Sequence, residues 1–468
     1  MKKTYLIVLL TLLLLAFSAC GRETEYDTSP EDENGIEVLT VLVPQAFRGL
    51  LFEVEQSMTR ALAEEGRSFR LERIIFRPEE IDEISVRLNV MLMAGQAYDM
   101  FFANDAFPMM TMARAGFLAD IYTIIDRCPY SDRDDFHAAA LDAFTINNGL
   151  YGFPLSFAFE FVGINADLPD EFIDRFAGYD NITYTQLMQI YADLQNRHGS
   201  EFSHLRIGNS FVFQDHIPII QGMIESFVDF ENHTANLVND RFISDLATIQ
   251  QLYSSGGLAI GRGYWMNLWV HGPFLRRIAE ENVFHFTNDR GLDAWTAFSP
   301  MPYFVHFIPI ADEQGRLRTL AGWDSIQTIH ISRERNEDLA WEFTRHMLSS
   351  LSDTGNLEWA VGIFSMATPI ERSCFEPHFL STGDMFRDLV HQHYRRRYNV
   401  AAVADTQGTR DTMVARMAHY SAMPMAPPIH FIPAALIANH VEMLLNGLIS
   451  PEEAAQRMQN AVTLWLIE

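Results

Sequence analysis

Alternating strand and helix patterns near the amino terminus constrain the fold of this chain more than any other feature. Three runs predict strands: a compact apolar run at 36–43, "FRLERIIF" at 69–76 and "YDMFFA" at 98–103. The two stretches between them have the apolar spacing of helices, and Gly95 stands where the second helix should end. This β-α-β-α-β order predicts a mostly parallel sheet covered by helices, in which ligands lie beyond the carboxyl ends of the strands.

The residues that follow the third predicted strand are therefore pocket candidates. Asn104, Asp105 and Phe107 come directly after it. They offer polar groups and an aromatic ring at the edge where a parallel sheet binds its ligand.

The first 20 residues have the pattern of an export signal. Two lysines precede an apolar run over residues 5–17, which is short for a membrane span, and small residues lead to Cys20. The ending "FSAC" resembles a bacterial lipobox, in which the cysteine is lipidated; an ordinary secretory signal that contains a cysteine is the alternative. We expect a signal peptide over 1–20, a lipid anchor on Cys20 and an acidic, flexible tether over 21–35.

Length and charge narrow the classes of function. With 468 residues the chain exceeds what one hydrophobic core usually supports, so two domains or lobes are expected. The formal net charge of −27 repels phosphate backbones, so no nucleic-acid partner is expected. The chain lacks a G-x-S-x-G motif and a Walker loop, and its cysteines form no metal-ligand spacing, so we expect no enzyme, cofactor or metal. Cys128 and Cys374 either pair with each other or stay as free thiols.

Six motifs follow one another in a fixed order after the tether: "VMLMAGQAYDMFFAND", "AGFLADI", "YGFPLSFAFEFVGINADL", "GLAIGRGYWM", "AGWDSIQTIHISRERNEDLAWEFTRHM" and "LISPEEAAQRMQNAV". Together they resemble family 1 of the extracellular solute-binding proteins, the lipoprotein receptors of bacterial sugar ABC transporters. The chain departs from the family pattern at Gly163-Ile164-Asn165, where Tyr-Asn is common, and at Trp323, where a second Gly is common.

The resemblance implies an α/β, periplasmic-binding-protein-like fold of two lobes, joined by a hinge of crossing strands around an interlobe ligand cleft. We place lobe one at 36–155 and 303–365, and lobe two at 156–302 and 366–468. It also implies a monomeric receptor, lipid-anchored on the extracytoplasmic face of the cell membrane. Such a receptor captures a carbohydrate by hinge closure, delivers it to the permease subunits of an ABC importer, and performs no chemistry.

Aromatic and acidic residues close together predict the carbohydrate contacts. A sugar stacks its C–H faces on aromatic rings, and its hydroxyls need polar partners. Trp323 and Asp324 supply both at the entry to a predicted strand, and an acid is rarely buried unpaired. Core packing is the alternative role for the aromatic residues. Further ligand-binding candidates are Trp265 and Trp269 from the middle of the chain, and Phe157 and Glu160 near the crossing strand.

Two other functions remain open at this stage. A cell-surface glycan hydrolase is also a secreted protein rich in tryptophan and acids, but it needs a placed pair of carboxylates, and no motif marks one. A surface adhesin would use the same fold without transport.

Overall fold

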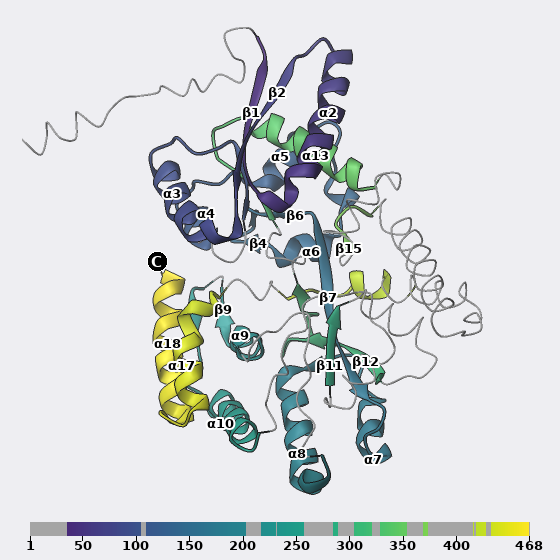
Figure 1. The fold of residues 1–468 in the computed structure, drawn as a ribbon, viewed down its shortest axis with the longest axis vertical. Helices are drawn as coiled ribbons and strands as arrows, with labels where there is room; N and C mark the ends of the chain where they lie inside the picture. Colours follow the sequence, from purple (N-terminus) through teal and green to yellow (C-terminus); the bar gives the residue numbers. More distant parts are fainter. Residues whose placement is uncertain are drawn as a thin grey trace, which may run out of the picture.

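The computed structural model describes residues 35–103, 109–202, 217–230, 232–256, 284–288, 304–320, 328–352, 368–372, 415, 418–426 and 432–467. Within them the chain is mixed α/β, with one sheet above a second sheet in Figure 1. Among these residues no helix is both long and apolar enough to cross a membrane.

The first sheet has five strands in the order β2-β1-β3-β14-β6. Their bounds are β1 Glu37–Pro44, β2 Phe69–Phe76, β3 Met100–Ala103, β6 Phe153–Pro154 and β14 Thr328–Ile331. β1 is parallel to β2 and β3, whereas β14 is antiparallel to both of its neighbours. The three predicted strands and their parallel arrangement are thus confirmed.

Helices cover both faces of this sheet (Figure 1). Side chains alternate across β1, so Val41 and Val43 enter the core beneath α2, while Leu42 enters the core beneath α3. We call these the α2-side core and the α3-side core. The α2-side core is built on α2 Arg48–Glu64, α5 Ile121–Arg127, α6 Ala138–Ala143 and α13 Glu337–Ser352, and the α3-side core on α3 Ile81–Met93 and α4 Met109–Arg114.

The second sheet runs in the order β11-β7-β12-β8. Its bounds are β7 Ser156–Asn165, β8 Ile182–Thr183, β11 Phe284–Asn288 and β12 Phe304–Ala311. β13 Thr319–Leu320 and β15 Thr368–Pro369 pair with the first half of β7.

Helices that pack beside this sheet form a separate second-sheet core: α7 Asp170–Ile173, α8 Tyr184–Phe202, α9 Ile217–Glu225, α10 Asp240–Ser254, α17 Ala434–Leu445 and α18 Pro451–Ile467. Two short hairpins lie outside the two sheets, β4 Thr145–Ile146 with β5 Gly149–Leu150 and β9 Val228–Asp229 with β10 Thr234–Ala235.

β7 connects the two sheets because its side chains change cores along its length. Phe159 and Phe161 belong to the α2-side core, whereas Val162 and Ile164 belong to the second-sheet core. β12 changes cores in the same way between Ile310 and Ala311. Two antiparallel strands therefore carry the chain from one hydrophobic core to the other.

Packing explains why β7 contains a glycine, Gly163. The pairing of β7 with β12 shifts register between Val305 and Ile308, and Phe307 lies inside the shift. A Cβ added at Gly163 would come within 2.6 Å of a Phe307 ring carbon. Glycine therefore lets this ring lie directly against the β7 backbone.

The last helix begins as its sequence predicts. The Ser450 hydroxyl accepts a hydrogen bond from the Glu453 amide at 3.2 Å, and Pro451 is the first helical residue. Ala454, Met458 and Val462 are buried on one face of α18, as their spacing predicts.

Candidate functional site

Strand ends gather along one edge of the first sheet. β1 and β2 end side by side at Pro44 and Phe76, β3 ends at Ala103, and the antiparallel β14 begins there at Thr328. Thr328 pairs with Ala103 on one side and with Pro154 of β6 on the other. This is the carboxyl edge of the parallel strands, the place where ligands bind in open α/β sheets.

Most of the predicted contact residues fall outside the described residues: Asn104, Asp105, Phe107, Trp265, Trp269, Trp323 and Asp324. The described residues nevertheless fix two attachment points. The chain leaves β3 at Ala103 and enters β14 at Thr328, and these two residues are direct cross-strand partners. The two sequence segments that carry "AND" and "GWDS" therefore join the sheet at the same edge.

Phe157 lies in β7 directly beyond this edge. Its ring is fully buried and makes edge contacts with His137 at 5.4 Å and with Phe159 at 5.5 Å between ring centroids. Phe159 is buried in the same core, the role that the sequence favours for it. The neighbouring rings cover Phe157, so its position supports the edge from beneath.

Glu160 belongs to a buried network of charged groups from four segments. Arg318, just before β13, donates to a Glu225 carboxylate oxygen at 2.9 Å, and its Nε lies 3.6 Å from a Glu160 oxygen. The Tyr184 hydroxyl, at the start of α8, donates to the other Glu160 oxygen. The side chains of Glu160, Arg318 and Glu225 are at most 5% exposed, so protein groups rather than solvent surround Glu160.

The charges of this network do not balance, because two carboxylates face one guanidinium. Arg318 is closer to Glu225, so Glu160 is the carboxyl group that holds a proton more readily. Burial raises the pKa of Glu160 to about 7, although Arg318 and Tyr184 act in the opposite direction. Burial also raises the pKa of Glu225.

Sequence reasoning missed Arg318, Glu225 and Tyr184. Glu225 is 93 positions from its arginine, and no spacing rule connects residues so far apart. Arg318 comes shortly after the polar stretch "DEQGR", so its neighbours in the sequence gave no sign that it is buried.

Cys128 is a free thiol in the structure, and Cys374 lies outside the described residues.

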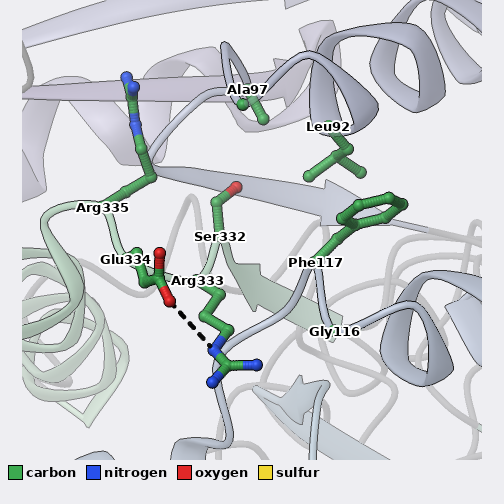
Figure 2. A pocket seen from close by; sticks show the side chains of 9 residues that line it. Leu92, Ala97, Gly116, Phe117, Ser332, Arg333, Glu334 and Arg335 are labelled. Carbon is green, nitrogen blue, oxygen red and sulfur yellow. Dashed lines mark ion pairs between the residues drawn. The ribbon is translucent and has the colours of Figure 1, made fainter.

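A pocket lies at the opposite edge of the first sheet (Figure 2). This pocket of about 190 Å³ includes Phe117, Ser332 and Arg333 in its lining. Arg333 is more than half exposed and lies 3.7 Å from Glu334, so its charge is both solvated and paired. Because it lies beyond the amino end of β3, this pocket is not at the edge where parallel strands bind ligands.

Comparisons with known proteins place the fold. No protein-family model matches the sequence, and a search of curated proteins finds no relative. Solved structures do match over nearly the whole chain. The sugar-binding protein MalE from Xanthomonas citri superposes with a TM-score of 0.57 at 12% identity, over 92% of this chain and 97% of that one. An ABC substrate-binding protein from Listeria monocytogenes, in complex with cycloalternan, superposes with a TM-score of 0.53 at 14% identity, over 91% of this chain and 97% of that one.

A third structure carries the family description itself. An extracellular solute-binding protein of family 1 from Alicyclobacillus acidocaldarius matches with a TM-score of 0.52 at 12% identity, over 93% of this chain and all of that one. The chain has the fold of these solute-binding proteins. The predicted α/β class and the predicted fold resemblance are therefore confirmed, and the carboxyl edge of the first sheet is the candidate site of a solute-binding-protein fold.

Proposed function

We propose that this protein is the extracytoplasmic carbohydrate receptor of an ABC importer and performs no chemistry itself. The direct pairing of Ala103 with Thr328 carries the proposal, because it brings the segments rich in aromatic and acidic residues to the carboxyl edge of the first sheet. The neighbours that share the fold are binding proteins for sugars and oligosaccharides rather than enzymes.

In this proposal the two sheets belong to two lobes, with β7 and β12 as the hinge between them. Lobe one comprises 36–155 and 303–365, and lobe two comprises 156–302 and 366–468. The change of core between Phe161 and Val162 supports a boundary within β7, a few residues beyond the proposed bound at residue 155. A ligand that bridges both lobes favours the closed arrangement, which the permease then recognises.

Contact with sugar is assigned to the predicted residues of the two segments. Trp323 stacks on a C–H face of the sugar, Asp324 and Asp105 accept its hydroxyls, and Asn104 and Phe107 complete the lobe-one side. Trp265 and Trp269 supply rings from lobe two. Phe157 and Glu160 contribute from beneath, as buried supports of the strand that leads out of the site.

A binding screen tests the proposal. The probes are cycloalternan and acarbose, which occur in complexes of structural neighbours, with linear oligosaccharides beside them. A carbohydrate at ~100 times its Kd should add about 2.7 kcal/mol to stability and raise the melting temperature by several degrees. Trp323→Ala should weaken binding of the best probe roughly thirtyfold, the effect of about 2 kcal/mol from an aromatic anchor.

Two results would contradict the proposal. A Trp323→Ala variant that melts much lower yet binds normally would make "GWD" a packing feature. Chromatographic detection of shortened oligosaccharides would indicate a hydrolase instead, provided that replacing one acid abolishes the turnover.

Attachment to the membrane is proposed through Cys20, on the strength of the lipobox-like "FSAC". Two acyl chains on this residue give stable anchoring. Cys20→Ala should move the protein to the soluble fraction with carbohydrate binding unchanged. Retention of the variant in membranes washed at high salt would place the anchor elsewhere.

A further inference from the structure

The two sheets are connected a second time, at a distance from β7. The C-terminal turn of α18 lies beside α4, which covers the first sheet (Figure 1). Arg114, the last residue of α4, donates a hydrogen bond to the backbone carbonyl of Leu466 in α18. This bond joins residues on helices that belong to different hydrophobic cores.

Two aromatic side chains extend the same contact. Trp465 of α18 and Phe230, just after β9, are half-buried, and each packs against both the second-sheet core and the α3-side core. Their ring centroids lie 6.4 Å apart, edge to face. The rings thus fill the gap between the cores, and Arg114 covers it with a polar contact.

The position of this contact matters for motion. In Figure 1 the α18–α4 contact lies on the left, whereas β7 and β12, which carry the chain between the sheets, lie right of centre. A rotation about β7 and β12 that opens a cleft between the sheets separates α18 from α4. The contact therefore exists in one arrangement of the lobes and is broken in the other.

The contact is also built to be weak. The Nε and Nη2 atoms of Arg114 are buried with no hydrogen-bond partner among the described residues. Opening the contact lets water reach these two donors.

We propose that the end of α18 is a latch that holds the lobes together, with Arg114, Trp465 and Phe230 as its parts. The inference rests on the two-lobe receptor proposed above. It assigns to the C-terminal helix a regulatory role in ligand capture, because a latch that favours the closed arrangement raises the apparent affinity by raising the closed fraction.

Small-angle X-ray scattering of the ligand-free protein tests the latch. Arg114→Met keeps the aliphatic packing and removes the hydrogen bond, and Trp465→Ala removes the larger ring. Both should increase the radius of gyration, and Arg114→Met should weaken the binding of cycloalternan about fivefold, the value of one hydrogen bond. The matched control is Leu464→Ala, one position away on α18 and 54% exposed, which should change neither quantity.

The outcomes separate the latch from the receptor function. An unchanged radius of gyration in folded Arg114→Met overturns the latch, even where Trp465→Ala unfolds lobe two and is uninformative. If no carbohydrate binds while Arg114→Met still expands the protein, the proposed function fails and the latch stands.

Discussion

The crossing at β7 and the contact at the end of α18 join the same two cores by different means. At the crossing, the backbone passes from one core to the other between Phe161 and Val162. The nearby Arg318 donates to Glu225 at 2.9 Å with both side chains buried, although Arg318 Nε and one oxygen of each carboxylate also lack a hydrogen-bond partner among the described residues. At α18, one hydrogen bond and two half-buried rings meet across the gap, and two donors of Arg114 have no described partner.

The difference shows how one fold can keep a fixed connection and a reversible one. Buried charges that are paired with each other hold their segments in one geometry, because losing a partner leaves an uncompensated charge. The α18 contact pairs a guanidinium with a backbone carbonyl, so opening it leaves no buried carboxylate without its cation and lets water reach the unpaired donors of Arg114. The crossing should therefore tolerate substitution poorly, and the α18 contact should tolerate it well.

Removing Arg318 is the severest way to test this contrast. Arg318→Met leaves Glu160 and Glu225 buried without their guanidinium, which should destabilise the protein by about 3–5 kcal/mol. Thermal or urea unfolding at pH 7 measures the loss. The loss should shrink at pH 5, because protonation removes the unpaired charges.

Arg316→Met is the matched control, two positions earlier in the same segment. Arg316 also pairs with a buried carboxylate, Asp312 at 2.7 Å, but Asp312 keeps hydrogen bonds from the backbone amides of Gln314 and Arg316. Arg316→Met should therefore lower the free energy of unfolding by about 1 kcal/mol. Equal losses of stability in the two variants would show that the buried network at the crossing stabilises the protein no more than the Arg316–Asp312 pair does.

A smaller effect is expected from Glu160→Gln, which keeps the shape of the side chain and removes its titration. The pKa of Glu160 rises from an ordinary 4.5 to about 7 in the folded protein. Between these values the folded chain holds a proton that the unfolded chain releases. The stability from Glu160 is therefore complete below pH 4.5 and is lost as the pH rises through 7.

Melting temperatures of both proteins from pH 5 to pH 8 measure this effect. The wild type should lose stability relative to Glu160→Gln across that interval. The contributions of His137 and His330 to the pH dependence drop out of the difference, because both proteins contain these residues. A difference between the two curves that does not change with pH would mean that Glu160 is already ionised beside Arg318.

The sequence predicted the parallel part of the first sheet well, because each of its strands carries buried apolar residues and is followed by a helix. Predicted and observed bounds of β1, β2 and β3 agree within two residues, and α2 begins one residue after its expected start. The strand predicted after Trp323 and Asp324 is β14.

The interior of the crossing could not be predicted in the same way. The partners of Arg318 come from β7, α8 and α9, and sequence patterns report which face a residue occupies but not which distant element meets it. For the same reason Glu160 was assigned to the ligand, although its carboxyl group faces Tyr184 and Arg318. The contact between α4 and α18 escaped prediction because Arg114 and Leu466 are 352 positions apart.

The position of β14 in the first sheet has a consequence for how the chain folds during synthesis. β14 lies between β3 and β6, yet its residues 328–331 are made long after both of these neighbours. Until they emerge, the growing chain holds β3 with one unpaired edge and an incomplete core beside it. Such an edge invites pairing with other chains, so the nascent protein is exposed to misassembly until residues 328–331 have been made.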